Sequence, residues 1–250
     1  MERTAFPLSR TGCSVQAEYA QENGYDIKNV LEIIQNDNDT NTIVYTSPEF
    51  QPYSDTFSDK YVFVGPSIRP TNNVFEKTRE KLVYISMGTV NNDMTIFYKN
   101  CIDAFKDSNY QVVLSVGSQV DIKHLEEYVT KLEGTAQFHV LTWVDQIAVL
   151  EKSDVFITHC GMNSVSEALY FKVPLVMYPQ TNEQKGVAFR VNELEAGLYL
   201  SGDSITEIQI AVKELLQQSK YKEQATVISN SFSKCGGSQR AVEKILDVCF

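Results

Sequence analysis

Residues 154–167 of this chain read DVFITHCGMNSVSE, and they contain the end of a strand, a tight turn and the start of a helix. Phe156 to Thr158 form the end of a buried strand, and Asn163 and Ser164 open the helix after the turn. The turn leaves free backbone N–H groups and the positive end of a helix dipole at the carboxyl edge of a parallel sheet. Phosphate groups bind at such places, and ligands of open α/β sheets lie outside the same strand ends. We therefore expect a phosphate-binding site here.

The sequence around this stretch alternates short β-branched runs with longer segments of helical periodicity. Strands are predicted at 82–87, 110–116, 137–141, 154–158, 173–178 and 197–200. Helices are predicted at 94–107, 122–132, 146–152, 163–171 and 183–196, and closing helices at 206–218, 221–232 and 238–248. Each crossover is long enough for a right-handed βαβ unit. The predicted fold class is α/β, a Rossmann-like doubly wound parallel sheet with closing helices.

The amino-terminal part of the chain has a different character. One helix is predicted at 27–34 and two short strands at 42–45 and 61–64. Prolines interrupt this part at Pro48, Pro52, Pro66 and Pro70. Prolines at this density suit a connector better than an independent core. We therefore divide the chain into residues 1–78, the tail of a preceding domain with a connector, and residues 79–250, the doubly wound domain.

Composition excludes several classes of function. The net charge of −10 and the pI of about 4.9 oppose nucleic-acid binding, which is built mainly on Lys and Arg contacts to phosphates. The sequence has neither an apolar run long enough for a spanning helix nor a signal peptide after Met1, so we expect a cytoplasmic protein without a membrane partner. The five scattered cysteines contain no C-x-x-C pair, which indicates reduced thiols and no metal site.

The motif at 154–167 continues in two flanking stretches, WVDQ at 143–146 and VPLVMYPQTNEQ at 173–184. Together they resemble the donor-binding signature of UDP-glycosyltransferases of the GT-B fold, and the chain is most similar to the bacterial macrolide-glycosyltransferase type. Further matches are the Val-Gly-Pro at 64–66, the Ile-Ser-Met-Gly-Thr at 85–89 and Ala188 with Val191. The resemblance covers essentially the whole chain, and a motif at fixed offsets over so many positions is specific.

The resemblance implies a role for each matching residue in binding a UDP-sugar, which is the donor substrate; no cofactor or metal is implied. Trp143 would stack on uracil, while Val144 and the Gln146 backbone would read the base edge; the alternative for Trp143 is a core position. Glu167 would hold the ribose hydroxyls, the alternative being a carboxylate that only complements the helix dipole. The residues implied at the diphosphate are Ser86, Thr89, His159, Gly161, Asn163 and Ser164. Glu183 and Gln184 would hydrogen-bond the transferred sugar; many relatives have Asp at the first of these positions.

The resemblance also implies what this chain does not supply. In the family an amino-terminal domain binds the acceptor and provides a histidine general base, whereas the first histidine here is His124. We therefore expect no catalytic base in this chain, which would hold only the donor half. The implied reaction is inverting, metal-independent hexose transfer to a hydroxyl of a small acceptor such as a phenolic or a macrolide.

Three interpretations of the chain remain open at this stage. It is a fragment of a full glycosyltransferase, a natural half-enzyme that works with a separate acceptor-binding chain, or a non-catalytic UDP-sugar-binding module or epimerase of the same fold class. The sequence also leaves open whether the chain self-associates. The Trp143 and Glu183-Gln184 pattern favours a glycosyltransferase over an epimerase.

Overall fold

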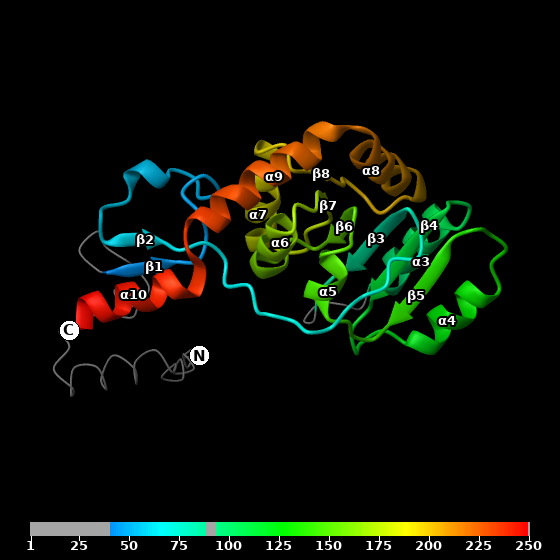
Figure 1. The fold of residues 1–250 in the computed structure, drawn as a ribbon. Coiled ribbons are helices and arrows are strands. Elements are labelled where there is room, and N and C mark those ends of the chain that lie inside the picture. The colour runs from blue at the N-terminus through cyan, green and yellow to red at the C-terminus, as the bar shows by residue number, and fades with distance from the viewer. Residues whose placement is uncertain (1–40, 89–93, 250) are drawn as a thin grey trace, which may run out of the picture.

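The structure is a computed structural model that describes residues 41–88 and 94–249. The helix expected at 27–34 and the candidate site residue Thr89 lie outside the described residues. The described part contains a six-stranded sheet covered by helices and a separate pair of short strands (Figure 1).

The main sheet is parallel throughout and has the strand order β5-β4-β3-β6-β7-β8. Its strands are β3 (Lys81–Ser86), β4 (Tyr110–Ser115), β5 (Gln137–Leu141), β6 (Val155–Thr158), β7 (Leu175–Met177) and β8 (Gly197–Tyr199). The chain winds outward from β3 to β5, returns to β6 beside β3, and winds outward again to β8. The doubly wound Rossmann-like sheet predicted from the sequence is therefore confirmed, and its topological switch point lies between β3 and β6.

Helices cover both faces of this sheet. One apolar cluster packs the sheet against α3 (Thr95–Phe105), α4 (Ile122–Thr130) and α8 (Ile205–Gln217). The other packs it against α5 (Gln146–Leu150), α6 (Met162–Tyr170), α7 (Asn182–Glu193) and α9 (Ser219–Lys234). Alternation along β3 supplies both clusters, because Val83 and Ile85 face the first and Leu82 and Tyr84 the second. The α5 and α6 face therefore lies beside Tyr84.

Several elements are shorter than the sequence predicted. The strand expected at 173–178 is limited to Leu175–Met177, because the Val173 N–H donates to Ala168 O at 2.9 Å and so belongs to the end of α6. The helix expected at 183–196 ends at Glu193, shortly before Glu195 takes a left-handed backbone with φ of 53°. These differences lie at element ends and leave the topology unchanged.

The segment before the sheet is bound to the helices of the second face. Its strands β1 (Thr42–Val44) and β2 (Tyr61–Phe63) pair in parallel, with the short 3₁₀ helix η1 (Ser54–Thr56) between them. Ser47 Oγ hydrogen-bonds Ser231 Oγ at 2.7 Å, and the Arg190 guanidinium donates to the carbonyls of Glu49 and Phe50, both at 2.7 Å. Phe50 is buried in the second apolar cluster. This segment thus packs against α7 and α9.

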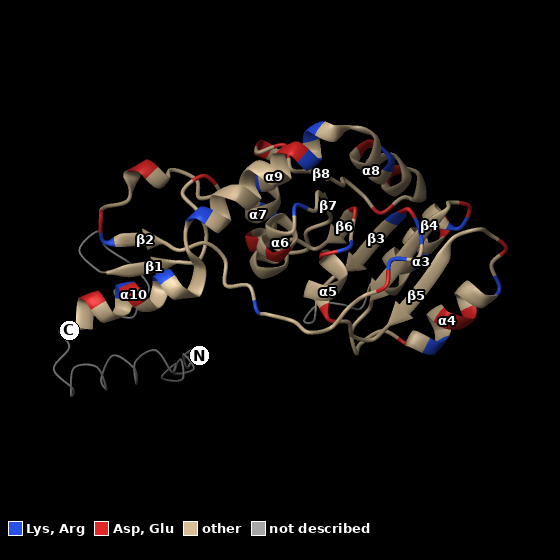
Figure 2. Cartoon of the chain, viewed as in Figure 1, with Lys and Arg blue, Asp and Glu red and all other residues tan. Residues whose placement is uncertain are grey.

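The last helix, α10 (Gly237–Cys249), begins beside the end of β2, where the Gly237 N–H donates to Val64 O at 2.6 Å. In Figure 1 it lies next to β1 and β2, away from the main sheet. Within residues 41–88 and 94–249, no helix has the length and apolar character needed to cross a membrane. Figure 2 shows Lys and Arg interspersed with Asp and Glu over many elements.

Candidate functional site

A cavity of about 630 Å³ opens at the carboxyl ends of the strands, at the switch point between β3 and β6. Its lining comes from the ends of β3, β4, β5 and β6 and from the starts of α5, α6 and α7. Eleven residues that the sequence predicted line it together: Ser86, Trp143, Val144, Gln146, His159, Gly161, Asn163, Ser164, Glu167, Glu183 and Gln184. The place and composition of this cavity are those of a small-molecule site.

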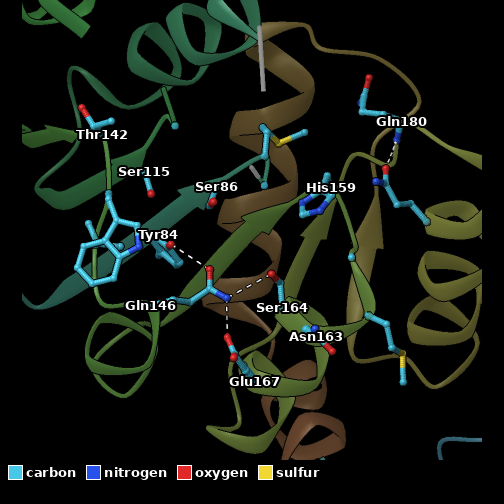
Figure 3. A pocket seen from close by; sticks show the side chains of 18 of the residues that line it. Tyr84, Ser86, Ser115, Thr142, Gln146, His159, Asn163, Ser164, Glu167 and Gln180 are labelled. Atoms are coloured by element: carbon cyan, nitrogen blue, oxygen red, sulfur yellow. Dashed lines mark hydrogen bonds between the residues drawn. The ribbon is translucent and has the colours of Figure 1, made fainter. Parts of the chain in front are cut away.

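The start of α6 forms one wall of the cavity. The helix begins at Met162, one residue before the predicted start, because Gly161 keeps an extended backbone (ψ 135°) and occupies the N-cap position. No side chain caps this end, so the first N–H groups of α6 have no side-chain partner at the cap. Asn163 and Ser164 lie at this end of the cavity (Figure 3). An uncapped helix start in a cavity attracts an anion.

His159 lies between two glycines at the same wall. A Cβ added to Gly88 or to Gly161 would come within 2.7 Å of the imidazole ring, so only residues without a side chain fit there. Burial lowers the pKa of His159, while the Ser86 backbone and the Glu183 carboxylate act in the opposite direction. Nδ1 is buried and makes no hydrogen bond of normal geometry within the described part of the chain. Burial thus favours the neutral form of this ring, which lines the cavity.

A hydrogen-bonded group of side chains continues the cavity wall from α6 toward β3 (Figure 3). The Tyr84 hydroxyl donates to Gln146 Oε1 at 3.1 Å, and Gln146 Nε2 donates to Glu167 Oε2 at 2.6 Å and to Ser164 Oγ at 3.2 Å. These residues come from β3, α5 and α6, so the group joins three elements across the switch point. The Glu167 carboxylate is therefore a bound acceptor at the cavity wall as well as a charge in the second turn of α6.

Trp143 lies at the rim of the cavity with 69% of its surface exposed. The alternative of a core tryptophan is therefore wrong. An exposed indole beside a polar cavity offers a flat apolar face to a ring of a bound molecule. The neighbouring Val144 is buried in the second apolar cluster.

Glu183 and Gln184 lie in the first turn of α7 and also line the cavity. Gln184 also closes a capping box, because Gln184 Oε1 accepts from the backbone N–H groups of Gln180 at 2.8 Å and Thr181 at 3.2 Å. This use of the oxygen leaves the Gln184 Nε2 amide to donate to a ligand. Sequence reasoning missed this double role, although the Thr-x-x-Gln spacing at 181–184 is a readable signal.

Asp145 is the second feature that sequence reasoning missed. It is buried and accepts hydrogen bonds from Arg69 at 2.5 Å, Thr71 Oγ1 at 2.6 Å and Asn73 Nδ2 at 2.6 Å. Burial by itself would raise the pKa of Asp145, but these three donors outweigh it and lower the pKa to about 2. The contacts bind the connector to the loop that carries Trp143, and they place Arg69 at the cavity wall.

Tyr84, Ser115, Gly117 and Thr142 also line the cavity without having been predicted. Among residues 41–88 and 94–249 the structure has no group of three or more His, Cys, Asp or Glu side chains arranged to hold a metal ion. The polar groups that line the cavity are thus hydroxyls, amides, an imidazole, carboxylates, the Arg69 guanidinium and the backbone of α6.

The chain is similar in sequence and in fold to known glycosyltransferases. Residues 73–234 match the family model described as UDP-glucoronosyl and UDP-glucosyl transferase. An uncharacterised UDP-glucosyltransferase of Bacillus subtilis is 38% identical over 236 residues, which cover 92% of this chain and 58% of that protein. A solved glycosyltransferase of kitacinnamycin has a TM-score of 0.80 at 26% identity, covering 92% of this chain and 60% of that one. The calicheamicin glycosyltransferase has a TM-score of 0.77 at 28% identity, covering 94% and 59%. The chain spans a little more than half the length of each.

Proposed function

We propose, because this chain belongs to the UDP-glycosyltransferase family, that its cavity binds the UDP part of a UDP-sugar. The observation that supports this most strongly is the arrangement around α6. An exposed indole for a base, a carboxylate for a ribose and an uncapped helix start for a diphosphate all line one cavity. Three unlike parts of one ligand thus each find a matching group.

Each part of UDP is assigned to residues by its chemistry. Uracil stacks on Trp143, and its polar edge is read at Val144 and Gln146. The ribose hydroxyls donate to Glu167. The diphosphate is held by the start of α6, with Asn163, Ser164, Ser86 and His159 around it.

The same residues suit the leaving group of a transfer reaction. Negative charge grows on the UDP oxygen as the bond to the sugar breaks, and donors already in place stabilise that charge without reorganisation. We infer that these protein groups perform the task for which other transferases use a divalent cation, so that binding is metal-independent. Glu183 and the Gln184 amide face the sugar and orient its anomeric carbon for an inverting displacement.

The acceptor is proposed to be a hydroxyl of a small molecule, such as a phenolic or a macrolide. The two solved glycosyltransferases named for kitacinnamycin and calicheamicin support this class. No residue of this chain is assigned as the general base. We propose that the acceptor site and its base belong to the part of the relatives that this chain does not span, on the same polypeptide or on a partner.

Calorimetric titration with UDP, UDP-glucose and other UDP-sugars tests the donor site, and a transfer assay with phenolic and macrolide acceptors tests the reaction. Binding with turnover far below ordinary enzyme rates of about 1 s⁻¹ agrees with a donor half, and turnover that appears on adding an acceptor-domain chain establishes the half-enzyme. Fast turnover by the chain alone would show that a base lies within it. Binding that no acceptor-domain chain converts into transfer would favour a non-catalytic UDP-sugar-binding module.

A further inference from the structure

We propose that Tyr84, buried beneath the cavity, is a positioning residue that sets the preference of the site for ribose over deoxyribose. It acts through Gln146 on Glu167, so the inference rests on the proposed function and deepens it. The hydroxyl group of Tyr84 makes its contact with Gln146, not with the start of α6, where the diphosphate is placed.

The hydrogen bonds of the Gln146 side-chain amide give it a defined orientation. Gln146 Oε1 can only accept, so the Tyr84 hydroxyl is the donor in the 3.1 Å bond between them. With its oxygen occupied by Tyr84, the Gln146 amide must turn its Nε2 toward α6. There it donates to Glu167 Oε2 and Ser164 Oγ. Tyr84, which donates to the amide oxygen, and Glu167, which only accepts, thus favour the same orientation of the amide.

The packing of the Tyr84 side chain holds it in place. Tyr84 is 1% exposed, and its ring stacks on Phe156 with 4.7 Å between centroids and 9° between planes. The two residues are direct partners in the register of β3 and β6, so backbone pairing fixes the stack. Burial also raises the pKa of the Tyr84 hydroxyl, which keeps the proton on it. A donor held in this way cannot follow Gln146 if the amide turns.

The second carboxylate oxygen of Glu167, Oε1, is the atom that we assign to the ribose. The terminal torsion of a glutamate has broad, shallow preferences, so a carboxylate without partners points in many directions. With Oε2 held by Gln146, Oε1 is left as the carboxylate oxygen of Glu167 that can accept from a ribose hydroxyl in the cavity. A site built to hydrogen-bond a hydroxyl discriminates against an analogue that lacks it, because its polar group is then left unpaired. Through its contact with Gln146, and through Gln146 with Glu167, the buried Tyr84 therefore contributes to the preference of the site for ribose.

The test compares calorimetric binding of UDP and 2′-deoxy-UDP to the wild-type chain and to Tyr84→Phe. We expect the wild-type chain to prefer UDP by roughly 10-fold or more, as for a hydrogen bond to a charged group. Tyr84→Phe should weaken UDP binding by roughly 3- to 10-fold and change 2′-deoxy-UDP binding by less than about 2-fold, so the preference falls. Glu167→Ala should abolish the preference.

Tyr221→Phe is the matched control. It also removes a buried hydroxyl, which donates to Glu214 Oε1 at 2.5 Å between α9 and α8, and it should leave the preference unchanged. If Tyr84→Phe fails to fold, Gln146→Met gives the same test, because Gln146 is only half-buried and the change removes all three bonds of its amide. Its preference for UDP should fall as well.

The outcomes separate the two proposals. A chain that does not bind UDP refutes the proposed function and this inference together. A wild-type chain that binds UDP and 2′-deoxy-UDP equally keeps the function and overturns the inference. A normal preference in folded Tyr84→Phe, or in Gln146→Met where that variant replaces it, overturns the inference as well, because the tyrosine would then be only a core residue.

Discussion

Replacement of Asp145 by asparagine should release the connector from the donor-site loop. The pKa of this carboxyl falls from 3.8 to about 2 in the folded chain, because hydrogen bonds from Thr71, Asn73 and Arg69 outweigh the cost of burial. A depression of this size corresponds to roughly 2.5 kcal/mol at about 1.4 kcal/mol per pKa unit. Arg69 is half exposed, and solvent screens its share, so we expect Asp145→Asn to cost about 1 to 2.5 kcal/mol at neutral pH.

The stabilisation of the folded chain by the Asp145 carboxylate should decrease as the pH falls. The folded-state pKa of Asp145 lies below the unfolded value of 3.8, so its stabilisation is present above about pH 4 and is lost as the pH falls through about 2. Roughly half of it should be gone at about pH 3. The difference in unfolding free energy between the wild-type chain and Asp145→Asn should therefore shrink between neutral pH and pH 3.

Urea unfolding of both proteins across this pH range measures the difference directly. Asp247→Asn, at an exposed position on α10, is the control and should show little effect at any pH. A difference that stays constant between pH 7 and about pH 3, or that is below about 0.5 kcal/mol throughout, would show that the ionised Asp145 carboxylate does not stabilise the folded chain.

Three further predictions concern the cavity. Trp143→Ala should weaken UDP binding by about 5- to 150-fold in calorimetry, as expected for loss of base stacking, and should leave the urea midpoint unchanged because the indole is 69% exposed; a variant that unfolds would contradict the assignment. His159→Gln should reduce the loss of stability between about pH 7 and pH 5, because burial lowers the pKa of His159 and the unfolded chain takes up the proton first as the pH falls through 6.5; equal losses in both proteins would count against a buried neutral ring. Addition of a chelator should leave UDP affinity unchanged, since the start of α6 and its neighbours supply the positive field; a tenfold or greater loss would overturn metal-independent binding.

Local pattern in the sequence was enough to predict the sheet and most of the cavity. Each strand and helix has its own periodicity, and each crossover is long enough to join parallel strands. The strand order β5-β4-β3-β6-β7-β8 comes from the structure and was not predicted. The residues near 143–146, 159–167 and 183–184 follow strand ends or open helices, and parallel strands bring all such ends to one edge. Their convergence on one cavity is a consequence of topology.

The features that were missed depend on contacts between distant segments. Tyr84 reads as one more apolar residue of a buried strand, and only the packing of α5 and α6 against β3 gives its hydroxyl a partner. Asp145 reads as a helix N-cap, whereas its actual partners come from the connector more than seventy residues earlier. Long-range pairs of this kind leave no periodic signal, so a single sequence does not reveal them.

We propose that the cavity binds UDP with its base against Trp143. Trp143 is the only tryptophan of the 250 residues, and it lies exposed at the rim, so its fluorescence reports on this contact alone. Titration of the purified chain with UDP should quench this emission saturably, and ADP should quench it more weakly at the same concentration. No saturable quenching by millimolar UDP, or equal quenching by ADP at matched concentrations, would contradict the account.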